Sequence, residues 1–105
     1  IAGIVRERFT RMATIQVGTE TAGANHWSYD VKVDDDGRTH EYHVTLSWSD
    51  YDLWSRGRVA PEKVVHAAFQ FLLDHEPADA IMSKFDCSVI RRYFPEVDKQ
   101  LPKMI

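Results

Sequence analysis

The segment HWSYDVKVDDDGRTHEYHVTLSW, residues 26–48, carries the strongest structural signal in the chain. Apolar and polar side chains alternate on both sides of its centre, which is the period of two expected of half-buried strands. The central run Asp34–Arg38 contains an Asp-Gly pair, and these two residue types tolerate the positive φ angles of a tight hairpin turn. The segment therefore predicts two antiparallel strands joined by a turn in solvent. The inward side chains would be Trp27, Tyr29, Val31, Val33, Tyr42, Val44, Leu46 and Trp48.

A third strand is expected before this hairpin, because two strands alone are only marginally stable in water. Residues 11–18 alternate in the same way, with Ala13, Ile15 and Val17 on one face. The stretch from Thr19 to Asn25 is typical of a connecting loop. The first half of the chain thus predicts a three-stranded antiparallel β-meander.

Helical signals fill the second half of the chain. Ser49 and Asp52 have the spacing of a capping box, and Gly57 is expected to end the short helix that they begin. Pro61 is expected in the first turn of the longest helix, which Pro77 must terminate. The apolar residues of this helix recur at helical spacing, and they are Val64, Val65, Ala68, Phe69, Leu72 and Leu73.

Two shorter helices are expected after Pro77. The first would bury Ile81, Met82 and Phe85; Asp86 would cap the second, whose buried residues would be Val89, Ile90, Tyr93 and Phe94. The two ends are left open: residues 1–10 can be flexible, and residues 96–105 can be either a frayed or a docked tail. The prediction is a single α+β domain over residues 1–105, in two layers, with the long helix covering one face of the meander.

Composition narrows the class of protein. The 105 residues suffice for one core, and 44% of them are hydrophobic. The net charge of −3 makes nucleic acid an unexpected partner. The apolar runs fall far short of the ~20 residues that cross a bilayer, so a membrane is not expected either. Cys87 is the only cysteine and cannot form an internal disulfide, which fits a cytoplasmic protein.

Three aromatic residues are the candidate binding site: Trp48, Tyr51 and Trp54, at the junction between the last strand and the first helix. If exposed, they could bind a peptide, a partner protein or a stacked base. The favoured alternative is that Trp48 and Trp54 close one end of the core, because a small domain rarely leaves two tryptophans in water.

Reactive and metal-binding residues are sparse. Cys87 near a helix start could be a nucleophile with His66 or His75 as its base, but its usual role would be that of a small buried apolar residue. His40 and His43 should face opposite sides of one strand, and no histidine or cysteine pair has the spacing of a metal site. We therefore assign no catalytic residue, metal ligand or cofactor from the sequence.

A resemblance concerns the last third of the chain. Residues 69–73 read FQFLL, Glu76-Pro77 and Ile81 follow, and residues 85–96 read FDCSVIRRYFPE. This succession resembles a C-terminal pattern, FxFLLxxEPxxxI…FDxSVIxRYFPE, in a family of small bacterial proteins of unknown function. The resemblance implies a strand-rich half followed by helices, and it implies no activity or functional residue.

The leading functional hypothesis is a small non-catalytic interaction or accessory domain. Its partner would be another protein, or a second copy bound through the apolar face of residues 90–101. One alternative is a small enzyme with a site assembled around Cys87 and a histidine. The other is a weak nucleic-acid-binding module that combines its arginines with Trp48 or Trp54.

Overall fold

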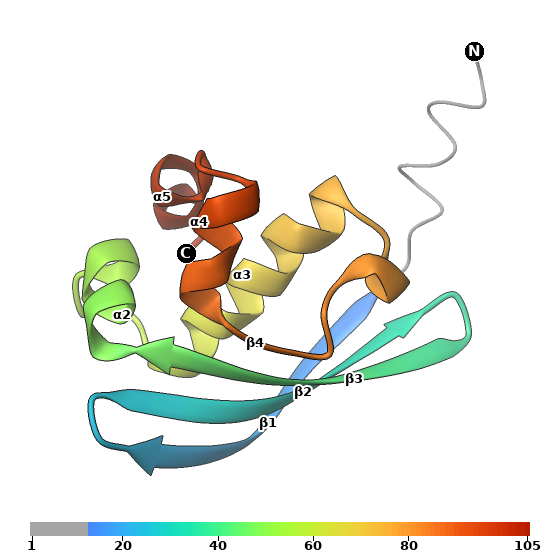
Figure 1. The fold of residues 1–105 in the computed structure, drawn as a ribbon, viewed down its shortest axis with the longest axis horizontal. Coiled ribbons are helices and arrows are strands. Elements are labelled where there is room, and N and C mark those ends of the chain that lie inside the picture. Colours follow the sequence, from blue (N-terminus) through green and yellow to red (C-terminus); the bar gives the residue numbers. More distant parts are fainter. Residues whose placement is uncertain (1–12) are drawn as a thin grey trace.

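The computed structural model describes residues 13–105, and no helix within them is long and apolar enough to cross a membrane (Figure 1). Two predictions lie outside this range: the flexibility of residues 1–10, and the first two residues of the strand expected over 11–18. In chain order the elements are β1 (Thr14–Gly23), β2 (His26–Asp35), β3 (Arg38–Ser47), α2 (Trp48–Ser55), α3 (Pro61–His75), the 3-10 turn η1 (Ala78–Ala80), β4 (Lys84–Asp86), η2 (Cys87–Val89), α4 (Ile90–Tyr93), α5 (Val97–Gln100) and η3 (Leu101–Lys103).

The predicted hairpin is confirmed. Strands β2 and β3 pair antiparallel without interruption, from His26 opposite Ser47 to Asp35 opposite Arg38. The turn between them consists of Asp36 and Gly37, with φ angles of 54° and 85°. Both angles are positive, as a two-residue turn that matches the twist of the strands requires. The Asp-Gly pair therefore sets the register that points one apolar face inward.

Strand β1 is longer than predicted, so the expected loop from Thr19 to Asn25 is wrong. The strand continues to Gly23 after a register shift between Val17 and Glu20, and only Ala24 and Asn25 form the turn. The phenol of Tyr29 donates a hydrogen bond to the Glu20 carboxylate across the two strands. Pairing with β2 and this contact continue the strand through a segment whose composition suggested a loop.

A fourth strand replaces the first of the two predicted short helices. The chain turns at η1 and then runs parallel to β3, where Phe85 of β4 lies opposite Val44. The backbone N–H of His43 donates to the Ser83 carbonyl at 2.7 Å, and the hydroxyl of Thr45 donates to Asp86. The sheet is therefore mixed and four-stranded, in the order β1-β2-β3-β4, rather than a meander of three.

Helix α2 begins one residue after β3, because Ser47 rather than Ser49 is its N-cap. The Ser47 hydroxyl accepts a hydrogen bond from the backbone N–H of Asp50 at 3.1 Å. At the other end Arg56 and Gly57 both adopt positive φ angles, of 52° and 76°. The expected left-handed end at Gly57 is thus present, with the helix cap one residue earlier than predicted.

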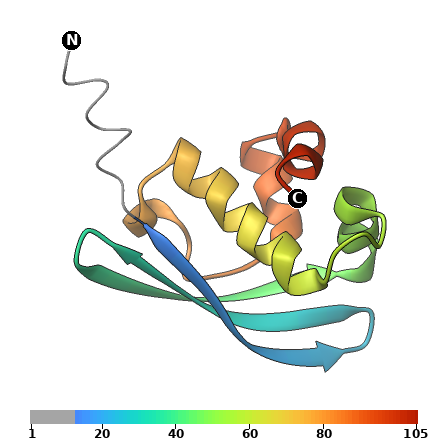
Figure 2. The ribbon, with the colours of Figure 1, turned by 180° about the vertical axis from the view of Figure 1, so that it is seen from behind.

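The long helix α3 covers the inner face of the sheet, as predicted. Figures 1 and 2 show from opposite sides that the helices lie on one side of the sheet, with α3 across it. Phe69 of α3 is fully buried, and its ring lies 5.1 Å from that of Tyr42 on β3 and 6.0 Å from that of Phe85 on β4. The core therefore joins α3 to both strands at once.

The C-terminal tail is docked, not frayed. Val97 and Leu101 are fully buried, and the carboxylate of Asp98 receives two hydrogen bonds from Arg91, at 2.9 and 3.0 Å. The same guanidinium donates to Asp50 on α2 at 3.0 Å. Asp98 also accepts a hydrogen bond at 2.8 Å from the indole of the buried Trp54. This polar cluster ties α2, α4 and α5 together.

Replacing Phe69 with alanine should reduce the free energy of unfolding by about 3–5 kcal/mol, because the change opens a cavity between α3 and two strands. Urea unfolding followed by circular dichroism measures the loss. Glu41→Ala, on the exposed face of β3, is the control and should change stability by less than about 0.5 kcal/mol. Equal losses in the two variants would contradict the assigned core.

The Arg91→Met variant should lose about 1–3 kcal/mol, since it leaves the carboxylate of the buried Asp50 without its guanidinium partner. The loss should stay below that of a fully buried pair, because the Arg91 side chain is one-third exposed. Arg92→Met, at the exposed neighbouring position on α4, is the matched control and should change the free energy of unfolding in urea by less than about 0.5 kcal/mol.

The same pair of variants tests the pH dependence of stability. The hydrogen bonds from Arg91, opposed by partial burial and helped by Trp54, hold the pKa of Asp98 below its usual range. A carboxyl whose pKa is lower in the folded state stabilises the fold above its unfolded pKa of about 3.9, and this contribution disappears as the pH falls through the folded pKa. Arg91→Met should therefore show a shallower loss of stability on acidification than the parent chain.

Candidate functional site

The three aromatic residues singled out from the sequence do not form one surface. Trp54 is completely buried, with the guanidinium of Arg91 5.6 Å from its ring centre. Tyr51 is partly buried, and its hydroxyl donates to the carbonyl of Val59. Trp48 begins α2 instead of ending the strand and is half exposed, so its predicted inward position is wrong. Trp54 therefore belongs to the core, which leaves Trp48 as the exposed ring of the three.

Trp27 on β2 also belongs to this aromatic group. The sequence placed Trp27 on the inward face of the sheet but gave no link to the other rings. Its ring contacts Tyr51 edge-on at a centroid distance of 5.2 Å and lies 6.4 Å from Trp48. Aromatic pairs in this geometry stabilise each other. The contacts give Trp27 and Tyr51 a structural role at the end of the sheet.

Cys87 is a buried core residue. Its side chain has no exposed surface, and burial, with smaller contributions from Asp86 and Asp50, raises the pKa of the thiol far above its usual range. Within residues 13–105 no hydrogen bond joins it to a histidine. The thiolate that nucleophilic chemistry requires is therefore disfavoured, as expected for a small apolar residue.

His40, His43 and His75 lie in different surroundings and make separate contacts. His43 is on the open face of the sheet, where its Nδ1 lies 3.0 Å from an oxygen of Asp30, and His40 stacks on Tyr42 on the other face. The predicted opposite orientation of these two is confirmed. His75 contacts the ring of Phe71 and its backbone carbonyl. In the part of the chain that the structure describes, no three histidine, cysteine or acidic side chains gather as metal ligands would.

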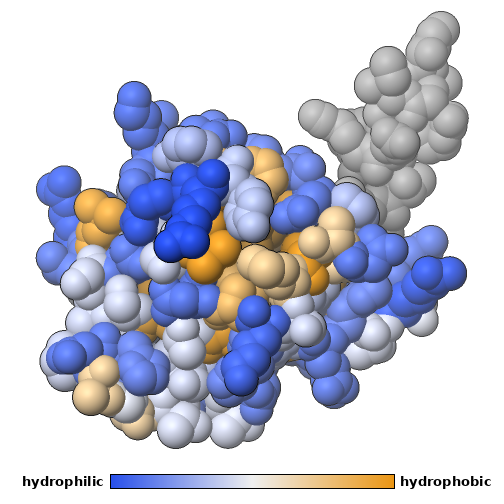
Figure 3. All heavy atoms as spheres, viewed as in Figure 1, coloured by the Kyte–Doolittle hydropathy of each residue, from blue (hydrophilic) through white to orange (hydrophobic). Residues whose placement is uncertain are grey.

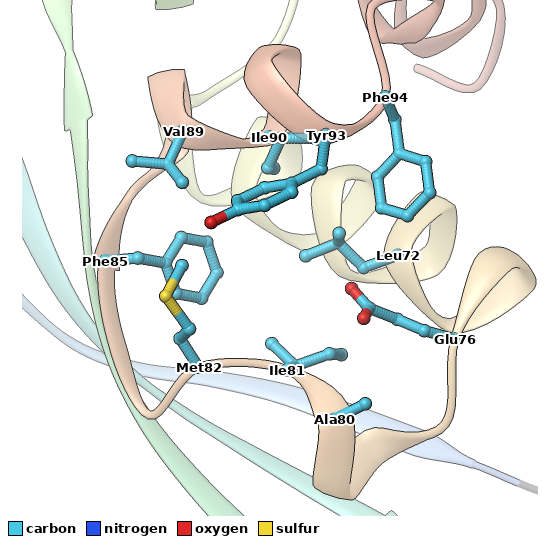
Figure 4. Close-up of a pocket in the computed structure, with 10 residues that line it drawn as sticks. All are labelled: Leu72, Glu76, Ala80, Ile81, Met82, Phe85, Val89, Ile90, Tyr93 and Phe94. Carbon is cyan, nitrogen blue, oxygen red and sulfur yellow. The ribbon is translucent and has the colours of Figure 1, made fainter.

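A mainly apolar groove lies between the end of α3, η1, β4 and α4, and we refer to it as the α3–α4 groove. It has a volume of about 270 Å³ (Figure 4). Hydrophobic atoms gather near the middle of this face, bordered by polar ones (Figure 3). The lining residues are Leu72, Glu76, Ala80, Ile81, Met82, Phe85, Val89, Ile90, Tyr93 and Phe94.

The groove forms because α3 ends before Pro77, and the chain then passes through η1 and returns to the sheet as β4. The space between the end of α3 and this returning segment is the groove. The hydroxyl of Tyr42 donates to the carbonyl of Ala78 at 2.6 Å and fixes η1 beside the sheet. Asp86 then accepts a hydrogen bond from the backbone N–H of Ser88, which begins the turn toward α4. Burial opposes ionisation of Asp86, but these hydrogen bonds from Ser88, with that from Thr45, lower its pKa. The space enclosed by η1, β4 and α4 stays partly open.

Two residues at the groove differ from the sequence prediction. Met82 and Tyr93 were expected to point inward from short helices, but they are 45% and 65% exposed. Met82 follows η1 in an irregular segment, and α4 has only one turn, so neither residue lies on a helix face long enough to be covered. Figure 4 shows both side chains at the edge of the groove. Their apolar character was visible in the sequence, whereas their exposure was not.

Comparison of the chain with protein-family models, with curated proteins and with solved structures found no match. The resemblance of the C-terminal segment to small bacterial proteins stays a prediction. Functional inference therefore rests on the geometry of the molecule.

Alkylation of Cys87 by iodoacetamide should be at least about a hundredfold slower in the folded chain than in chain unfolded by guanidinium, because the buried thiol reacts only after opening. Mass spectrometry of timed samples measures both rates. A Cys87→Ser variant, which cannot be alkylated at this position, controls for reaction elsewhere. Rapid labelling of the native chain would revive the nucleophile hypothesis.

Proposed function

We propose that the protein is a non-catalytic interaction domain whose α3–α4 groove receives a large apolar side chain from a peptide segment of a partner protein. The observation that carries this proposal is the combination of a concave apolar cavity with exposed apolar residues at its edge. Exposed hydrophobic surface of this kind is typical of interaction sites, whereas singly scattered apolar residues are normal.

The size of the groove supports a single anchoring residue. A volume of about 270 Å³ accommodates one phenylalanine or leucine side chain together with part of its backbone. Burial of such a side chain contributes about 1.5–3 kcal/mol, which is enough for an anchor but requires further contacts for stable association. Met82 and Tyr93 stand at the edge, where those contacts would be made.

The chemistry of the lining supports binding rather than catalysis. Its polar groups are the carboxylate of Glu76 and the phenol of Tyr93, and it contains no serine, cysteine, lysine or histidine. A nucleophile with an adjacent base, which group transfer would require, is not among these residues. The methionine at the edge is flexible and polarizable, a property that suits adaptable binding surfaces.

A simple probe of this groove is N-acetyl-phenylalanine amide, which presents one aromatic peptide side chain. At about −0.3 kcal/mol for each of its roughly 15 non-hydrogen atoms, its dissociation constant should be about a millimolar. Titration followed by ¹H–¹⁵N NMR should shift the amide signals of Ile81, Phe85 and Tyr93. A Met82→Ser, Tyr93→Ser double variant should bind at least about fivefold more weakly, because both replacements remove apolar contacts at the edge.

The control is Leu53→Ser, which removes another half-exposed apolar side chain from α2, away from the groove. It should leave the titration unchanged. Shifts centred on Trp48 would place the binding surface at the other end of the sheet and contradict the proposal. Groove signals that depend on protein concentration in the absence of probe would indicate a second copy of the chain as the occupant instead.

A further inference from the structure

We propose that the α3–α4 groove selects a cation: the segment that it binds carries a lysine or arginine next to its apolar anchor, and Glu76 receives that positive charge. This inference rests on the proposed function, because it concerns the specificity of the same groove. Its support comes from the placement of one carboxylate, from the helix end beside it and from the rings around it.

Glu76 is the only charged residue of the lining. Figure 4 shows its carboxylate directed from the end of α3 into the space beside Leu72 and Ile81. Within residues 13–105, no ion pair or side-chain hydrogen bond involves this carboxylate. The neighbouring acid Glu96 differs, since one of its oxygens lies 3.6 Å from Nε2 of His75. Of the acids near this end of α3, Glu76 is the one that lines the groove.

The end of α3 adds to the negative potential at the same place. The helix ends at His75, and Glu76 is its C-cap. The C-terminus of a helix carries a partial negative charge from its aligned peptide dipoles, and this charge favours a cation nearby.

The rest of the lining fits the non-polar part of a basic side chain. The ring of Phe85 on β4 and the rings of Tyr93, the last residue of α4, and Phe94, which follows it, border the groove (Figure 4). The methylene chain of lysine can lie along such rings while its ammonium group reaches the carboxylate, and the faces of the rings themselves attract cations. An anionic or neutral polar group at this position would meet repulsion or no partner.

Three dipeptides that differ in one side chain test the selectivity: N-acetyl-Phe-Lys amide, N-acetyl-Phe-norleucine amide and N-acetyl-Phe-Glu amide. Norleucine keeps the methylene chain of lysine and removes its charge. NMR titration at low salt should show the lysine peptide binding about fivefold more tightly than the norleucine peptide, as expected for a partly exposed ion pair. The glutamate peptide should bind most weakly, and added salt should reduce the differences.

Glu76→Gln and Glu76→Lys are the matched variants. The first keeps the shape and removes the charge, so the lysine and norleucine peptides should bind with a ratio near one. The second should reverse the order in favour of the glutamate peptide. Because Glu76 is partly exposed, both variants should fold, and an unchanged pattern of amide signals outside the groove verifies this.

The outcomes separate the two proposals. Equal binding of all three peptides at the groove overturns the cation selectivity and leaves the interaction function standing. A lysine preference that survives in Glu76→Gln also overturns the assignment of Glu76. If none of the peptides shifts the groove signals, both the selectivity and the proposed function fail.

Discussion

The packing of α3 across the sheet is the contact on which the other features of the molecule depend. Helix α3 buries more than one side: Phe69 faces the strands, whereas Phe71 meets Phe94 edge-on at a centroid distance of 5.9 Å. A helix that is apolar on so wide a surface must be covered by something besides the sheet. The segment from η1 to η3 supplies that second cover, and this requirement explains why the chain returns to the sheet as β4 before turning toward α4.

The segment from η1 to η3 covers α3 closely near α2 and leaves the C-terminal end of α3 partly open. Near α2, Arg91 joins Asp50 and Asp98 in a hydrogen-bonded cluster, and no buried side-chain nitrogen or oxygen lacks a partner within residues 13–105. Near the C-terminus of α3 the covering elements are short, and the α3–α4 groove remains between them. The hydrogen bonds of Arg91 fix the position of α4, and α4 is one border of the groove.

The parts of the fold that were predictable are those determined by residues close in sequence. The Asp-Gly turn fixes the hairpin, and the wide apolar stripe after Pro61 specifies α3, because both depend on spacing within a few residues. Strand β4 was missed because Lys84 pairs with His43 on β3, a partner far away in the chain, and three residues are too few to show a period of two. The N-cap was misplaced because Ser47 and Ser49 both fit the local pattern.

The candidate site was harder to predict for the same reason. Whether an aromatic residue is buried depends on partners far away in the sequence. The indole of Trp54 donates to Asp98 on the docked tail, whereas Tyr93 stays 65% exposed. Periodicity identified Met82 and Tyr93 as apolar but assumed helices long enough to bury them. Exposure is a property of the assembled surface, so it became visible only with the fold.

The aromatic group of Trp27, Trp48 and Tyr51 and the α3–α4 groove are two apolar regions of the surface, and they differ in how far their side chains contact one another. Trp27 and Tyr51 contact each other, and Trp48 lies against the same group, so that end of the sheet is largely satisfied by its own contacts. The α3–α4 groove instead combines an open apolar cavity with the carboxylate of Glu76. Apolar surroundings weaken the hydration of a carboxylate, and they offer it no hydrogen-bond donor in return. A ligand with an apolar side chain and a cation would fill the cavity and pair with the carboxylate at the same time. The groove therefore supports the binding proposal better than the tryptophans do.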